Sequence, residues 1–176
     1  MNPEPPGTEI PESESKVHED GQRVAAVSLL FVDDEESFRK LTARELSRTG
    51  YEVDAVGTLE EARQLLAHKY FHLVLLDVRL PDGNGLDLLQ EIREASPSTE
   101  VVMLTAYGTV QEAIRAMKQG AHDFLTKPCK LVELEERLEK AMQKQYLQRG
   151  NAALRRDVER LGAGEHFVGQ SSLIRE

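Results

Sequence analysis

The stretch Phe71-His72-Leu73-Val74-Leu75-Leu76-Asp77 decides the fold of this 176-residue chain. It is an apolar run that ends on a single carboxylate. A continuous apolar run, in which polar and apolar residues do not alternate, is typical of a strand in a parallel sheet that is covered on both faces. The charged side chain of Asp77 must therefore lie at an edge of that sheet.

Three further apolar runs also end on polar side chains. They are Val27–Val32 before Asp33 and Asp34, Val101–Leu104 before Thr105, and Phe124–Thr126 before Lys127 and Pro128. The carboxyl ends of parallel strands lie on one edge of an open α/β sheet, and ligands bind where the strand order reverses. We therefore expect three acids, one hydroxyl and one ammonium group to converge on one pocket.

From Val27 onward, strand patterns alternate five times with helical patterns. The second strand in chain order is Tyr51–Val56, and a loop is expected over Pro81–Gly85. Such alternation predicts right-handed βαβ crossovers and a doubly wound α/β fold with five parallel strands. The expected strand order is 2-1-3-4-5, whose switch point lies between the first and third strands. The strand ends that carry Asp33, Asp34 and Asp77 lie at that point.

Composition restricts the class of protein. The chain is 40% hydrophobic and 30% charged, and it has neither an apolar stretch long enough to span a bilayer nor a secretory signal. We therefore expect a globular, cytoplasmic protein without a membrane partner. A net charge of -9 argues against direct binding of nucleic acid, and a single cysteine, Cys129, excludes an internal disulfide.

The clustered acids predict a metal site. Three carboxylates within a few ångströms are tolerated at neutral pH only if one is protonated or a cation lies among them. A set of oxygen donors selects a hard cation such as Mg²⁺ or Mn²⁺. The alternative is that Asp33 or Asp34 simply caps the following helix.

A metal beside a lone carboxylate points to phosphoryl transfer. Asp77 is the acid best placed to act as a nucleophile and form an aspartyl phosphate. Lys127 would supply a positive charge to the phosphoryl group, and the Thr105 hydroxyl a hydrogen bond. Positioning and charge neutralisation are most of what this reaction requires.

Four motifs resemble those of the receiver domain of two-component response regulators. They are Phe31-Val32-Asp33-Asp34-Glu35, Leu75-Leu76-Asp77-Val78-Arg79-Leu80-Pro81-Asp82-Gly83-Asn84-Gly85, Leu104-Thr105-Ala106-Tyr107 and Phe124-Leu125-Thr126-Lys127-Pro128. The resemblance covers residues 27–144 and implies a flavodoxin-like fold whose Asp77 is phosphorylated by a sensor histidine kinase.

The resemblance also implies individual roles. Asp34, Asp77 and the backbone carbonyl of Arg79 would bind Mg²⁺ directly, and Asp33 through a water molecule. Thr105 and Phe124 would form a switch pair, Tyr107 and Arg79 would flank the site, and the Lys127–Pro128 peptide would be cis. Such a domain catalyses only its own phosphorylation and dephosphorylation.

The remainder of the chain suggests further segments. Residues 1–26 are rich in proline and acids and are expected to be a disordered tail. Residues 145–163 carry a second apolar stripe that predicts a helical coiled-coil linker and a homodimer, the alternative being a single helix laid on its own domain. The stripe changes register near Gly150.

Residues 164–176 resemble the opening of the AAA+ ATPase domain of NtrC-type, sigma-54-dependent activators. No phosphate-loop motif occurs in the sequence, so we do not expect this chain to carry the ATPase, and no helix-turn-helix segment follows. Contacts with sigma-54 RNA polymerase and DNA would therefore be made through missing domains. The alternatives are a stand-alone receiver in a phosphorelay or a small phosphatase of the same fold class. A phosphatase of that kind has a second acid two positions after its nucleophile, where this chain has Arg79.

Overall fold

A computed structural model describes residues 26–106 and 108–162, with side chains as far as Leu147. Its main strands are β1 (Val27–Val32), β2 (Tyr51–Val56), β3 (Leu73–Asp77), β6 (Glu100–Thr105) and β7 (Asp123–Thr126). Its helices are α1 (Glu36–Arg48), α2 (Leu59–His68), α3 (Gly85–Ala95), α4 (Val110–Lys118) and α5 (Leu131–Gly162).

The five main strands form one parallel sheet in the order β2-β1-β3-β6-β7. In chain order this is 2-1-3-4-5, so the predicted doubly wound fold is confirmed. Strands β1 and β3 are direct neighbours, with Val32 opposite Leu76. The strand order reverses beside this pair, which places the ends of β1 and β3 at the switch point.

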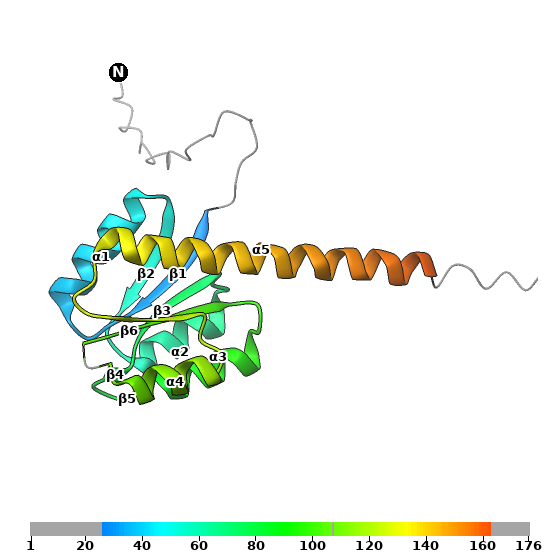
Figure 1. The fold of residues 1–176 in the computed structure, drawn as a ribbon. Coiled ribbons are helices and arrows are strands. Elements are labelled where there is room, and N and C mark those ends of the chain that lie inside the picture. Colours follow the sequence, from blue (N-terminus) through cyan, green and yellow to red (C-terminus); the bar gives the residue numbers. More distant parts are fainter. Residues whose placement is uncertain (1–25, 107, 163–176) are drawn as a thin grey trace, which may run out of the picture.

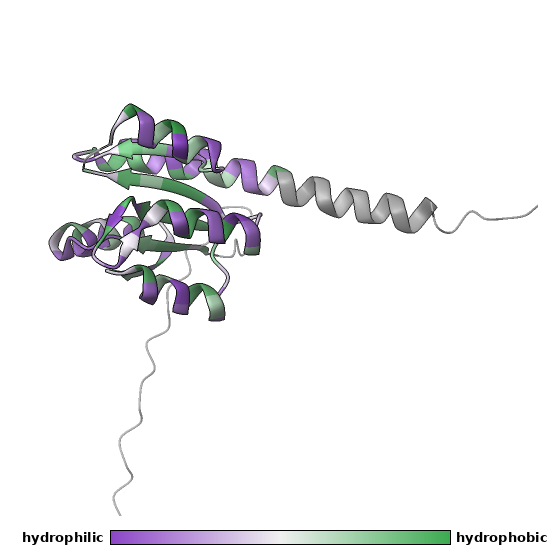
Figure 2. Cartoon of the chain, turned by 90° about the horizontal axis from the view of Figure 1, so that it is seen from below, coloured by the Kyte–Doolittle hydropathy of each residue, from purple (hydrophilic) through white to green (hydrophobic). Residues whose placement is uncertain are grey.

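Two layers of helices cover the sheet. Helices α1 and α5 lie on one face, and α2, α3 and α4 lie on the other (Figure 1). Alternate residues of β3 serve the two faces: Leu73 and Leu75 belong to the core under α1 and α5, and Val74 and Leu76 to the opposite core. Both faces are buried, which explains why β3 is apolar up to its final residue, Asp77. Figure 2 shows the hydrophobic strands between the helix layers.

A short antiparallel hairpin occupies the region that the sequence predicts as a loop. Strand β4 (Arg79–Leu80) pairs with β5 (Gly83–Asn84). At its tip, the Asp82 carboxylate accepts the backbone N–H groups of Leu59 and Glu60 at 2.9 and 3.0 Å. The hairpin is thereby tied to the first turn of α2.

Helix α4 has an exposed apolar stripe. Val110, Ile114 and Met117 are 76%, 48% and 48% exposed, and Ala116 is the residue of this helix that is buried. In contrast, the large apolar residues of α3, including Leu86 and Leu89, are buried. The periodicity of α4 therefore identifies an apolar face that the described part of the chain leaves largely uncovered.

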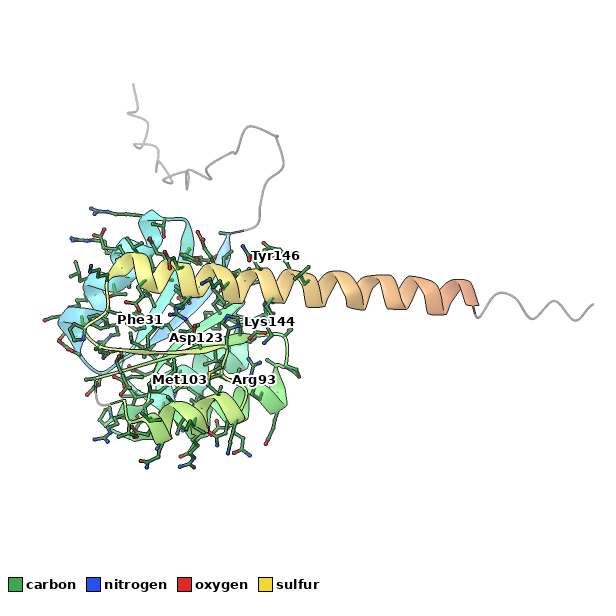
Figure 3. The ribbon with its side chains drawn as sticks, in the orientation of Figure 1. Phe31, Arg93, Met103, Asp123, Lys144 and Tyr146 are labelled. Carbon is green, nitrogen blue, oxygen red and sulfur yellow. The ribbon has the colours of Figure 1, made fainter. Side chains whose placement is uncertain are left out.

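Helix α5 is continuous from Leu131 to Gly162. Its first half packs on the sheet through Leu134, Leu138 and Ala141, as the first stripe predicts. Gln145 is fully buried, and its Nε2 donates to the Tyr70 hydroxyl at 2.9 Å. Figure 3 shows Lys144 and Tyr146 near the point where α5 extends past the sheet.

Several predictions lie outside the described residues. They concern the tail at 1–25, Tyr107, the second stripe of α5 and the segment 164–176. The assigned domain boundaries stay predictions. Among the described helices, none combines the length and the apolar character that crossing a membrane requires.

Candidate functional site

Three carboxylates meet at the ends of β1 and β3. One ligand oxygen from each of Asp33, Asp34 and Asp77 lies within 4.8 Å of the other two. The adjacency of β1 and β3 produces this cluster, because Asp33 directly follows β1 and Asp77 is the last residue of β3. The predicted convergence of the three acids is confirmed.

Asp33 is held at the inner side of the cluster. Its side chain is fully buried, and its Oδ1 accepts the Glu35 N–H at 2.9 Å. Burial raises the pKa of Asp33, Lys127 opposes that shift, and the charge of Asp77 adds to it. Asp34, in contrast, is exposed.

Lys127 reaches the cluster from the end of β7. Its Nζ lies 2.9 Å from Asp77 Oδ2 and also forms an ion pair with Asp33. Burial lowers the pKa of Lys127, but the hydrogen bonds to Asp33 and Asp77 outweigh that effect, so its pKa lies above its usual value. The Nζ also lies 4.8 Å from the centre of the Phe38 ring. The Lys127–Pro128 peptide is cis, as predicted.

The charges of this site do not balance. Three carboxylates and one ammonium leave two net negative charges in a mostly buried cluster. A hard divalent cation would compensate for both, and the donors are all oxygen, which Mg²⁺ prefers. The residues present therefore fit a Mg²⁺ site.

The Asp77 carboxylate is held by its own loop. Its Oδ1 accepts the Arg79 N–H at 3.1 Å, while Oδ2 contacts Lys127. Gly85 packs against the same strand end: a Cβ at this position would lie 2.0 Å from the Asp77 carbonyl oxygen. The glycine lets α3 begin directly beneath the phosphoacceptor candidate.

Thr105 and Phe124 lie on the two strands beyond Asp77. Thr105 is buried at the end of β6, and its carbonyl accepts the Lys127 N–H at 2.8 Å. The half-buried Phe124 ring packs against the core and against Gly108, where a Cβ would lie 2.8 Å from the ring. This position of the ring is compatible with a switch pair, whose roles remain a prediction.

One contact of the site could not be recognised in the sequence. The Arg39 guanidinium donates to the Asp33 carbonyl oxygen and lies 3.1 Å from where a Cβ of Gly57 would stand. Arg39 thus links the β1–α1 corner to the segment after β2. Helical spacing places Arg39 one turn after Glu35, but spacing does not show that its side chain folds back on the corner.

Comparison with known proteins shows which family has this sequence pattern. A family model described as the response regulator receiver domain matches residues 29–139. Response regulator protein PilR from Pseudomonas aeruginosa is 50% identical over 107 residues, which are 61% of this chain and 24% of PilR.

Two solved structures are also similar. NtrX from Brucella abortus is 34% identical with a TM-score of 0.70, over 74% of this chain and 30% of that one. The beryllofluoride-activated NtrC4 receiver domain dimer is 35% identical with a TM-score of 0.65, over 67% and 98% of the two chains. The chain thus spans about a quarter to a third of the length of PilR and NtrX.

Proposed function

Because the chain belongs to the response regulator receiver family, we propose that Asp77 accepts a phosphoryl group from a sensor histidine kinase in the cytoplasm. The observation that carries this proposal is the contact of 2.9 Å between Lys127 Nζ and Asp77 Oδ2 inside the cluster of three carboxylates. A nucleophilic carboxylate beside a fixed cation is what phosphoryl transfer requires.

In the proposed step, a carboxylate oxygen of Asp77 attacks the phosphorus of a phosphohistidine. The new O–P bond forms as the N–P bond breaks, and the imidazole nitrogen leaves with the electron pair of that bond. Lys127 neutralises one phosphoryl oxygen, and the Thr105 hydroxyl donates to another. Attack by water on the acyl phosphate releases inorganic phosphate and restores Asp77, so the domain catalyses only its own phosphorylation and dephosphorylation.

The cofactor we propose is Mg²⁺. Asp34, Asp77 and the Arg79 carbonyl would hold it directly, and Asp33 through water. When bound, the metal would neutralise charge on the phosphoryl oxygens. The two uncompensated charges of the cluster support this assignment.

Phosphorylation would act as a switch. It replaces the single charge of the Asp77 carboxylate with a phosphoryl group that carries nearly two negative charges, and it draws Thr105 towards that group, while Phe124 turns inward and Tyr107 adjusts beside the site. Shifting a two-state element from about 1:99 to 99:1 requires about 5.5 kcal/mol of differential binding. A few charge-assisted hydrogen bonds can supply that amount.

The output we propose is a change in dimer packing that controls a downstream AAA+ transcriptional activator of the NtrC type. The exposed stripe of α4 and the extension of α5 past the sheet offer surfaces for a second copy. The similarity to PilR and to an activated receiver dimer supports this context. Contacts with sigma-54 RNA polymerase and DNA would be made by other domains.

The test is phosphorylation with a small donor. The protein is incubated with acetyl phosphate and Mg²⁺, its intact mass is recorded, and its oligomeric state is followed by light scattering. We expect one phosphoryl group on the wild type, none on Asp77→Asn or in chelator, and a normal adduct on the control Asp87→Asn, which changes an exposed acid of α3. An adduct on Asp77→Asn would overturn the assignment of the site.

A further inference from the structure

Arg79 connects the phosphorylation site to helix α4. It is the second residue after Asp77, and its Nη2 lies 3.6 Å from Glu112 Oε1 in the first turn of α4. Its backbone N–H meanwhile donates to Asp77 Oδ1 at 3.1 Å. One residue thus contacts the acceptor carboxylate with its main chain and α4 with its side chain.

The two oxygens of Glu112 have separate partners. Oε2 accepts the backbone N–H and the hydroxyl of Thr109 at 3.1 and 3.2 Å, and the Thr109 hydroxyl accepts the Glu112 N–H at 3.1 Å. These bonds form the capping box that begins α4. Since Oε1 faces Arg79, the ion pair can be lost without removing any of the atoms that form the cap, so the first turn keeps its hydrogen bonds but loses the restraint from Arg79.

The pair is loosely held. The Arg79 side chain is 62% exposed and the Glu112 side chain 24%, and an exposed pair at this distance contributes little to stability. A weak contact of this kind is easily redirected by a stronger anion.

We propose that Arg79 is a positioning residue that restrains the first turn of α4 through Glu112 while Asp77 is unphosphorylated. When Asp77 is phosphorylated, the guanidinium turns to the phosphoryl group and releases that turn. This inference rests on the proposed function and adds a regulatory contact to the same site.

Charge and geometry favour the exchange of partners. A phosphoryl group carries nearly two negative charges and three acceptor oxygens, and a guanidinium binds such a group with two parallel hydrogen bonds. The Glu112 carboxylate has one charge and already accepts two hydrogen bonds from Thr109. The phosphoryl group is therefore the stronger partner for Arg79.

The chain offers variants that separate the pair from the cap. Glu112→Gln removes the charge that attracts Arg79 but keeps an oxygen for Thr109, because glutamine also serves in a capping box. Arg79→Gln removes the cation, and Arg79→Lys keeps it. The control is Arg63→Gln, which breaks an exposed ion pair between α2 and α3. In that pair Arg63 donates two hydrogen bonds of 2.9 Å to Glu91, and neither residue belongs to the acid cluster.

Amide hydrogen exchange of residues 110–113 is the readout. It is measured on the full chain before and after treatment with acetyl phosphate and Mg²⁺, with intact mass giving the phosphorylated fraction. In the wild type we expect phosphorylation to speed exchange about two- to five-fold, the effect expected for losing an exposed ion pair. Glu112→Gln and Arg79→Gln should exchange at the faster rate before phosphorylation, and Arg63→Gln should behave like the wild type. Arg79→Lys keeps the charge but not the two parallel hydrogen bonds, so its response to phosphorylation should be smaller than that of the wild type.

A second readout is the half-life of the acyl phosphate. Arg79→Gln should change it, because the guanidinium no longer contacts the phosphoryl group, whereas Glu112→Gln should retain the wild-type value or lengthen it. A purely structural role of the pair would move neither half-life. Two results would overturn this inference and leave the proposed function intact. One is unphosphorylated Glu112→Gln whose amides 110–113 exchange as slowly as those of the wild type. The other is an equal effect of phosphorylation on that exchange in both proteins. A wild-type protein that never forms the adduct would overturn the proposed function and the release step together.

Discussion

Lys127 Nζ lies 2.9 Å from Asp77 Oδ2, although the two residues are 50 positions apart and strand β6 runs between their strands. The contact exists because β3, β6 and β7 are parallel, so their carboxyl ends reach the same edge. Lys127 also pairs with Asp33, so a single ammonium group links the two buried acids of the cluster. Lys127 is therefore the cation that pairs with both buried carboxylates.

Replacing Lys127 with methionine should destabilise the protein by about 3 kcal/mol in the presence of chelator, because it leaves a buried carboxylate without its ion pair. Part of that loss should return when Mg²⁺ is added, since the metal supplies positive charge to the same acids. Urea denaturation followed by circular dichroism measures both effects. Lys40→Met, which removes an exposed pair with Glu36, serves as the control and should leave stability nearly unchanged.

Mg²⁺ should stabilise the wild type by about 2.7 kcal/mol when its concentration is a hundredfold above Kd, because the cluster binds it only in the folded state. Asp34→Asn should weaken binding at least about tenfold, since it removes a charged ligand. Thermal unfolding at increasing Mg²⁺ measures the shift, with circular dichroism as the signal because the chain has no tryptophan. Equal stabilisation of both proteins would contradict the assignment of Asp34 as a ligand.

Gly85→Ala should lower the free energy of unfolding by about 2 kcal/mol or more and reduce phosphorylation of Asp77. The added methyl group would stand 2.0 Å from the Asp77 carbonyl oxygen, so the end of β3 must shift. Gly57→Ala is the matched control, because its nearest neighbour is the movable end of Arg39 at 3.1 Å. If the two variants unfold at the same denaturant concentration, close packing beneath Asp77 is not what requires the glycine.

Asp82 should stabilise the protein in a pH-dependent manner. The hydrogen bonds from Leu59 and Glu60 lower the pKa of Asp82 below its usual value of 3.8. Its contribution is therefore present above 3.8 and is lost as the pH falls through the lowered pKa of the folded state. We expect Asp82→Asn to melt at a lower temperature than the wild type at pH 7, and the gap to close in acid; a gap that is constant with pH would exclude this origin.

The sheet and the acid cluster could be predicted because each strand, with the polar residue at its end, is a contiguous stretch of the chain. Unbroken apolar runs mark strands buried on both faces, and the polar residue after each run marks the edge where Asp33, Asp77 and Lys127 meet. The alternation of strands and helices predicts a doubly wound sheet, and five strands favour the order 2-1-3-4-5 that is observed. The cis Lys127–Pro128 peptide was expected from the family resemblance alone.

Contacts made by a single distant side chain could not be predicted in this way. Asp82 caps a helix that begins 23 residues earlier, and buried Gln145 donates to Tyr70, 75 residues away. Neither pairing leaves a periodic signal. The two-residue strands of the β4–β5 hairpin are too short to show alternation, and the apolar period of α4 does not reveal whether another element covers it.

The measurement that tests the central claim most directly is chemical mapping of the phosphorylated residue. The protein is treated with acetyl phosphate and Mg²⁺ and reduced with borohydride, which converts an aspartyl phosphate to homoserine, and its peptides are sequenced by mass spectrometry. The account predicts homoserine at position 77 and nowhere else in the acid cluster, and its loss when chelator is present. Homoserine at position 33 or 34, or unchanged aspartate at position 77 in protein whose intact mass shows a phosphoryl group, would contradict it.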